Sequence, residues 1–90
     1  MAKVVWTDQA IGDVVEIVEW ISADKPNAAA RVAETLMRTG DSLDQFPGCG
    51  RLIPHDRREL IALPSYLIRY RVENGRVTIL ELRHAARRPE

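Results

Sequence analysis

The sequence predicts an α+β domain in which one strand and two helices precede a run of strands. Apolar residues recur at helical spacing between residues 8 and 46, and strand-forming segments separated by turn residues follow them. The expected order is β-α-α-β-β-β, with a helical hairpin packed on one face of a small antiparallel sheet. Residues 1–90 should form a single domain, because 90 residues lie near the lower limit for burying an independent core.

The first strand is expected at residues 3–6, a short run of strand-forming side chains. Thr7 follows, and its hydroxyl can cap a helix by accepting hydrogen bonds from the free amides of the next turn. We expect this helix over residues 8–23, because its apolar residues recur at helical spacing: Ile11, Val14, Val15, Val18 and Ile21.

The second helix is expected to begin at the break formed by residues 24–27. Pro26 suits the first helical turn, where its missing N–H is not needed, and Asp24 or Asn27 is a candidate cap. The short connection forces the helices antiparallel, so residues 8–46 should form a helical hairpin. Gly40 lies within the apolar stripe at a cost of about 1 kcal/mol relative to alanine, which indicates a close approach to a neighbouring element.

The second half of the chain is expected to form strands. A short edge strand at residues 51–54 precedes a charged loop, and three strands follow at 59–63, 66–73 and 76–84. We expect a three-residue turn with a glycine bulge in the last hairpin, because a two-residue turn would set Ile68 opposite Glu81. One sheet face then carries Tyr66, Ile68, Tyr70, Val72, Leu80 and Leu82, and the other carries Arg69, Arg71, Glu81 and Arg83.

The chain is neutral overall, but its charge is divided between its two halves. Residues 1–50 contain four Lys/Arg and eight Asp/Glu, a net charge of −4, whereas residues 51–90 contain nine Arg and five Asp/Glu, a net charge of +4. Every basic residue of the second half is arginine, whose rigid fork of donors suits phosphate or carboxylate recognition. The alternative is a solvated sheet face that binds nothing.

The sequence does not indicate an exported protein, a membrane protein or a metalloprotein. Its amino terminus lacks the apolar stretch of a signal peptide, and no apolar run approaches the roughly 18 residues of a membrane span, so a cytoplasmic protein is expected. Cys49 is the only cysteine and a poor candidate nucleophile. No cofactor or metal is expected, because no Cys, His and acidic residues have ligand spacing.

Short motifs follow one another in a specific order along the whole chain. They are Trp6-Thr7 with Ala10, Pro26-Asn27-Ala28-Ala29, Leu43 with Phe46-Pro47 and Gly50-Arg51, Arg58-Glu59-Leu60, residues 65–72, residues 77–80, and His84 to Arg87. In this order the chain resembles the RelE/ParE toxin superfamily of type II toxin–antitoxin systems, most closely the ParE-like branch. The resemblance implies a bacterial toxin held silent by a cognate antitoxin, whose flexible tail folds over the toxin.

The resemblance implies one of two activities. RelE-like members cut messenger RNA on the ribosome, whereas ParE-like members inhibit DNA gyrase without cutting nucleic acid. Cleavage at the ribose 2′-hydroxyl needs a proton acceptor, a proton donor and cations around the transition state. Here the candidate residues are His84, Arg51, Arg58, Arg69 and Arg71. For His84 the alternative is a hydrogen-bonded structural histidine at a strand end.

Two departures from the RelE-like pattern favour a non-catalytic gyrase inhibitor. Leu67 stands where these nucleases usually carry an arginine, although Arg69, two residues along the same face, is a candidate substitute. The tail after His84 has no aromatic residue to stack on a base. All five aromatics are expected in the core: Trp6, Trp20, Phe46, Tyr66 and Tyr70. An mRNA endonuclease and a non-toxic interaction module remain the alternatives.

The sequence also predicts how the two partners bind. The residues expected to contact the target are Arg69, Arg71, Arg83, His84, Arg87 and Arg88, which would meet an acidic or DNA-associated surface of gyrase. Strand addition at a sheet edge, or helix docking on the hairpin, would hold the antitoxin. The contacting antitoxin segment is expected to be acidic, because it would complement the arginines.

Overall fold

A computed structural model describes residues 2–85 of the chain and confirms the predicted α+β class and element order. The elements are β1 (Lys3–Trp6), α1 (Asp8–Ser22), α2 (Pro26–Asp41), a 3-10 turn η1 (Ser42–Asp44), β2 (Arg51–Ile53), β3 (Arg57–Leu63), β4 (Tyr66–Glu73) and β5 (Arg76–His84). Neither helix of this part of the chain is long and apolar enough to cross a membrane.

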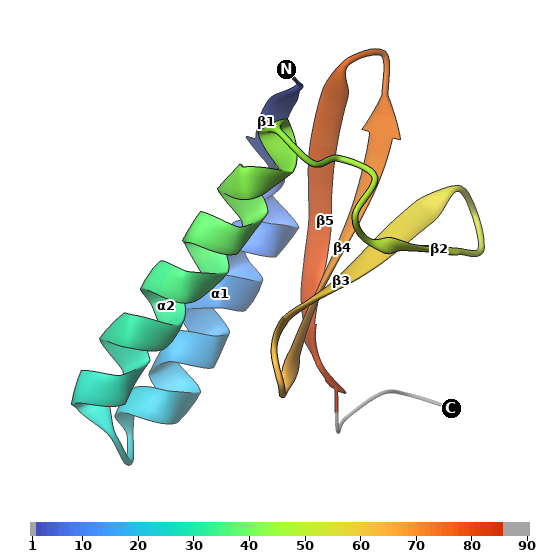
Figure 1. The fold of residues 1–90 in the computed structure, drawn as a ribbon. Coiled ribbons are helices and arrows are strands. Elements are labelled where there is room, and N and C mark those ends of the chain that lie inside the picture. Colours follow the sequence, from blue (N-terminus) through green and yellow to red (C-terminus); the bar gives the residue numbers. More distant parts are fainter. Residues whose placement is uncertain (1, 86–90) are drawn as a thin grey trace.

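The strands form one sheet in the order β1-β5-β4-β3-β2. The strands β2 to β5 pair antiparallel, as predicted, whereas β1 runs parallel to β5, so the sheet is mixed. The β1 edge therefore differs from the antiparallel expectation. Along the chain, the helical hairpin separates β1 from the other strands, and parallel strands need a long crossover connection of this kind. Figure 1 shows the two helices side by side on one face of the sheet.

The hydrophobic core lies between the helical hairpin and the covered sheet face. Its largest fully buried side chains are Tyr70, Leu36, Leu43, Ile68, Ile79 and Val77. Helix α1 contributes Ala10 and Val14, with Ile17 and Ile21 packed against the same cluster. The predicted stripe of α1 was therefore partly wrong, because Ile11 and Val15 lie on the flank of the helix with 47% and 50% of their surface exposed.

The expectation that all five aromatics are core residues was also wrong. Tyr66 and Tyr70 are buried and Trp6 packs against the core, but Trp20 and Phe46 are 64% and 63% exposed. Ile21, the next residue of α1, packs against the core. Because neighbouring residues on a helix point in different directions, the Trp20 side chain points away from the core. Phe46 follows η1, outside both helices.

The helix ends follow the predictions in part. Thr7 caps α1 as expected, because its Oγ1 accepts a hydrogen bond from the amide of Ala10 at 3.1 Å. Helix α2 begins at Pro26 with Lys25 at its N-cap and has no side-chain cap, so the candidate caps Asp24 and Asn27 were wrong. The helical hairpin also ends earlier than residue 46, because η1 replaces the last predicted turn of α2.

The register of the last hairpin corrects the sequence-based expectation. Asn74 and Gly75 form a two-residue turn with φ values of 50° and 75°, and Glu73 pairs with Arg76. A bulge then adds one residue to β5, because Arg69 lies opposite Glu81 while Tyr70 lies opposite Ile79. The core face of β5 therefore carries Val77, Ile79 and Leu82, and the predicted core position of Leu80 was wrong.

A buried tyrosine fixes the loop between η1 and β2. The hydroxyl of Tyr70 donates to the carbonyl of Pro47 at 2.8 Å and accepts from the amide of Gly50, also at 2.8 Å. Burial raises the pKa of the Tyr70 phenol, so the hydroxyl stays protonated and keeps its donor. These two hydrogen bonds hold the loop in the position from which β2 pairs with the edge of β3.

Replacing Gly40 tests the close approach of α2 to the sheet. An added Cβ would lie 2.7 Å from Cη2 of Trp6 and 2.9 Å from Cδ1 of Ile79. We expect Gly40→Ala to lower the free energy of unfolding by about 1–3 kcal/mol despite alanine's better helix propensity.

The matched control is Gly12→Ala in α1, where the added Cβ meets nothing within 4 Å. Urea denaturation should show this variant unchanged or more stable, by up to about 1 kcal/mol. Equal effects at both glycines would contradict the close packing of Gly40.

Candidate functional site

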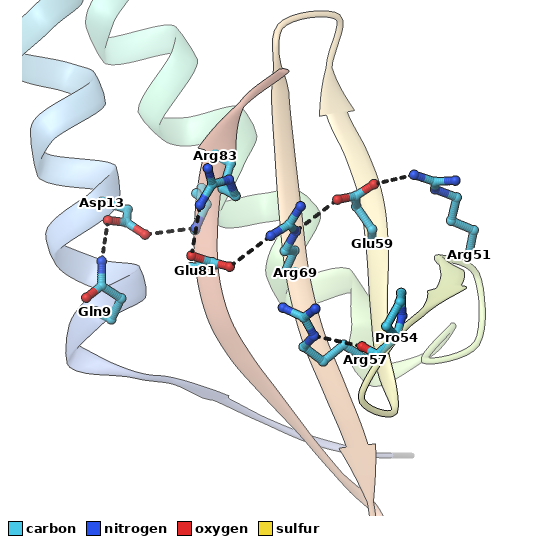
Figure 2. A network of polar contacts seen from close by, with 10 residues as sticks. Gln9, Asp13, Arg51, Pro54, Arg57, Glu59, Arg69, Glu81 and Arg83 are labelled. Carbon is cyan, nitrogen blue, oxygen red and sulfur yellow. Dashed lines mark hydrogen bonds and ion pairs between the residues drawn. The ribbon is translucent and has the colours of Figure 1, made fainter. Parts of the chain in front are cut away.

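The sheet face away from the helices carries a row of alternating charges across four strands (Figure 2). Nη2 of Arg51 on β2 lies 2.9 Å from Oε1 of Glu59 on β3. Nε of Arg69 on β4 lies 2.9 Å from the other Glu59 oxygen, and its Nη1 lies 3.2 Å from Glu81 on β5. Arg83 ends the row 3.6 Å from Glu81. We call these five residues the charge ladder.

Glu59 is the most deeply placed member of the charge ladder, with 7% of its surface exposed. Burial alone would raise the pKa of this carboxyl, but the hydrogen bonds from Arg51 and Arg69 outweigh burial and hold the pKa below its ordinary value. For Arg69, burial opposes the charged form, whereas the hydrogen bonds that it donates to Glu59 and Glu81 raise its pKa. The pKa shifts of Glu59 and Arg69 therefore both favour the charged form of the side chain.

The charge ladder corrects the expectation of a basic sheet face, because Glu59 and Glu81 pair with arginines there. The predicted pairing of Arg69 with Glu81 is confirmed, but Arg69 also binds Glu59, so both sides of its guanidinium are engaged. Arg83 shares Glu81, and its Nε is buried with no acceptor in the described residues. Arg69 thus serves as a bridge between two carboxylates and is a poor substitute for the arginine absent at buried Leu67.

The residues expected for a nuclease do not converge. His84 packs edge to face on Tyr66, with ring centroids 5.0 Å apart, on the side of the sheet that holds the core. Arg58 donates instead to the carbonyls of Gly48 and Gly50. Arg71 lies five residues along β4 from Tyr66, roughly 16 Å away, and on the opposite face. These candidate nuclease residues lie too far apart, and on two different faces of the sheet, to contact one phosphate group together.

Three arginines on the far face, Arg57, Arg71 and Arg76, have no carboxylate partner in residues 2–85, and the first two hold a turn in place. Nε of Arg57 donates to the carbonyl of Pro54 at 2.9 Å, and Nη2 of Arg71 donates to the carbonyl of His55 at 3.1 Å. These bonds brace the turn between β2 and β3, in which His55 and Asp56 have φ values of 69° and 57°. We call Arg57 and Arg71 the uncompensated pair, because their positive charge is not cancelled by an ion pair.

The sequence prediction missed Glu59 and Arg57 as organisers of this face. The pairing of β2 with β3 sets Arg51 opposite Glu59, and the pairing of β3 with β4 sets Glu59 opposite Arg69. Opposite charges at directly opposed positions were the available signal, but it needed the register of β2 and β3. The predicted contacts Arg87 and Arg88 lie outside the described residues.

Comparison with known proteins assigns the chain to a family. Residues 4–89 match the model of the ParE toxin of the type II toxin–antitoxin system parDE. The chain belongs to the ParE toxin family. As a ParE-family protein it is the toxin of a type II toxin–antitoxin system, and its partner is a cognate antitoxin.

Individual relatives agree with this membership. Toxin RelE2 of Caulobacter vibrioides is 46% identical over 87 residues, which cover 97% of this ParE-family chain and 99% of that protein. Toxin RelE1 of the same organism is 33% identical over 76 residues, covering 80% and 81% of the two chains. A solved structure described as the chromosomal ParDE TA system from P. aeruginosa has the same fold, with a TM-score of 0.85, 21% identity and coverage of 93% and 96%.

The charge ladder predicts an acid-sensitive contribution to stability. Because the pKa of Glu59 is lower in the folded state, its contribution is present above its ordinary value of 4.5 and is lost as the pH falls through the folded-state pKa. We expect Glu59→Gln to lower the free energy of unfolding by about 2 kcal/mol at pH 7 and by less below pH 4.5.

The control for this prediction is Glu34→Gln. Glu34 pairs with Arg38 at 3.3 Å, but both side chains are about 70% exposed, so this change should cost less than about 0.5 kcal/mol. Urea denaturation at pH 7 and at pH 3.5 measures both variants. A Glu59→Gln difference that stays constant with pH would contradict the role of the ionised carboxylate.

Proposed function

We propose that this ParE-family toxin inhibits DNA gyrase without cutting nucleic acid. Support comes from the scatter of the residues that a nuclease would need: His84 packs on Tyr66 beside the core, whereas Arg71 lies on the other face. A protein inhibitor needs no convergent acid, base and phosphate ligands, only a surface complementary to its target. The spread of these residues is the observation that carries the proposal.

In this proposal the uncompensated pair on the far face contacts gyrase. Arg57 and Arg71 keep their net charge because they bind only backbone carbonyls, while the arginines of the charge ladder share their charge with carboxylates. Positive charge that is not cancelled within the toxin is free to attract an acidic or DNA-associated surface. Arg87 and Arg88, from the sequence prediction, add to the proposed contact.

The cognate antitoxin would cover the same arginines with an acidic segment. Such a segment supplies the carboxylates that Arg57 and Arg71 do not receive within the described chain. Binding there would block the gyrase contact directly, so neutralisation and target recognition would compete for one surface.

The function is tested with the purified toxin in two parallel reactions. One measures supercoiling of relaxed plasmid by gyrase, and the other measures cleavage of messenger RNA on translating ribosomes. We expect inhibited supercoiling and intact transcripts. Ribosome-dependent cleavage that disappears in His84→Ala would overturn the proposal in favour of a nuclease, and inactivity in both reactions would indicate a non-toxic interaction module.

Removing the uncompensated pair should weaken the toxin. We expect Arg57→Ala/Arg71→Ala to raise the concentration needed for half-inhibition of supercoiling by at least about tenfold, because two desolvated charges are lost from the contact. Arg87→Ala/Arg88→Ala should act in the same direction.

The control is Lys25→Ala/Arg31→Ala, which removes the same charge from the helical hairpin, where both residues are exposed. This variant should inhibit gyrase as well as the wild type. Circular dichroism verifies that each variant is folded. Equal losses in the two double variants would show that overall charge, and not this surface, determines inhibition.

A further inference from the structure

Four basic side chains lie together at one end of the far sheet face, beside the turn between β4 and β5. Lys3 on β1 pairs with Arg76 on β5, and both residues are exposed. The next pair along these strands, Val4 with Val77, packs in the core. Because side chains alternate between the two faces of a strand, Lys3 and Arg76 project from the far face.

Arg57 on β3 and Arg71 on β4 continue this surface. Two adjoining carbonyls of the turn between β2 and β3 accept hydrogen bonds from their guanidinium groups, at 2.9 and 3.1 Å, so the two cations lie close together. Arg71 pairs with Thr78, which is two residues along β5 from Arg76. The Cα atoms of Arg71 and Arg76 are therefore diagonal neighbours, roughly 7–8 Å apart. We call the four basic residues Lys3, Arg57, Arg71 and Arg76 the cationic end.

The carboxylates near the cationic end do not cancel its charge. None of its four residues forms an ion pair within residues 2–85. Glu73 lies opposite Arg76, but it is exposed and also forms no ion pair in the described chain. Asp56 lines a hollow with Leu52 and Val72 on the helix side of the sheet. Positive charge therefore dominates this end of the far face.

The cationic end lacks the features that usually bind a protein or a single-stranded nucleic acid. Within residues 2–85, Ile61 is the one large exposed apolar side chain on the far face, and it lies four residues along β3 from Arg57, roughly 13 Å away. The aromatic residues of the described chain lie in the core, on α1 or in the loop after η1. Protein interfaces usually have an apolar or aromatic centre, and single-stranded nucleic acids stack their bases on aromatic rings. Repeated negative charge is what this surface can recognise.

We propose that the cationic end binds the phosphate backbone of duplex DNA. The duplex presents negative charge at short, regular intervals along a rigid surface, which suits several separated cations and requires no apolar centre. Contacts to phosphates carry no sequence information, so binding is expected to be independent of base sequence. This contact rests on the proposed function and deepens it, because it names DNA held by gyrase as the partner of these arginines.

The charge ladder sets the limit of this DNA contact. In the next row of the face Arg69 lies opposite Glu59 and Glu81, and these carboxylates engage the guanidinium and repel phosphate. About four phosphates at most are then neutralised, so the logarithm of the affinity should fall with the logarithm of the salt concentration with a slope no steeper than about −3.6.

Fluorescence anisotropy with the purified toxin and a short labelled DNA duplex tests this contact. The double variant Lys3→Ala/Arg76→Ala removes two cations and leaves the hydrogen bonds that brace the turn in place. We expect it to bind at least about fivefold more weakly than the wild type, with a salt slope reduced in magnitude by about 2. The matched control Lys25→Ala/Arg31→Ala removes the same charge from the helical hairpin and should stay within about twofold of the wild type. Equal losses in the two double variants would overturn the assignment of DNA to the cationic end.

Two other probes separate duplex DNA from its alternatives. The same sequence as a single strand, and polyglutamate as a stand-in for an acidic protein surface, should each bind more weakly than the duplex. Tighter binding of either probe would overturn the assignment to duplex DNA. Salt-insensitive binding of the wild type would overturn it as well, and this measurement decides the matter if the double variant does not fold.

Gyrase assays distinguish the DNA contact from the proposed function. A wild-type toxin that inhibits supercoiling but does not bind the duplex would overturn the DNA contact and leave the proposed function standing. A wild-type toxin that binds the duplex but leaves gyrase active would sink the proposed function and not the DNA contact.

Discussion

A single extra residue in β5 determines how the charge ladder and the contact between β5 and α1 are built. Side chains alternate between faces along a strand, so an inserted residue reverses which residues face the core beyond it. Before the bulge Val77 and Ile79 are buried, and after it Leu82 takes that role. The same shift sets Glu81 opposite Arg69 and turns the amide of Leu82 toward Asp13. The charge ladder and the hydrogen bond between Leu82 and Asp13 therefore share one structural cause.

The charge ladder shows why the number of arginines is a poor measure of a basic surface. Glu59 is buried between two arginines, and a carboxylate in that position must stay ionised to satisfy them. Arg69 consequently donates its hydrogen bonds to Glu59 and Glu81 within the protein. Within residues 2–85, the positive charge that no ion pair cancels comes from residues such as Arg57 and Arg71, which donate to backbone carbonyls and also brace a tight turn.

The two flanking strands are short, so within the described chain part of β5 and part of β3 have a strand neighbour on one side only. Strand β1 covers only the first half of β5, and β2 covers only the first part of β3. Soluble proteins usually protect such edges, and here Asp13 of α1 accepts a hydrogen bond from the amide of Leu82, while the Thr7 hydroxyl donates to the carbonyl of Leu80.

The sequence by itself determined the α+β class, the element order, the cap at Thr7 and the close approach at Gly40, because these depend on local spacing and residue type. Family motifs added the toxin identity. Only the tertiary structure decided the parallel pairing of β1, the bulge at Leu80 and the partners of each arginine. Those features depend on which residues meet across strands distant in sequence. A local pattern gives no information about such contacts until the register is fixed.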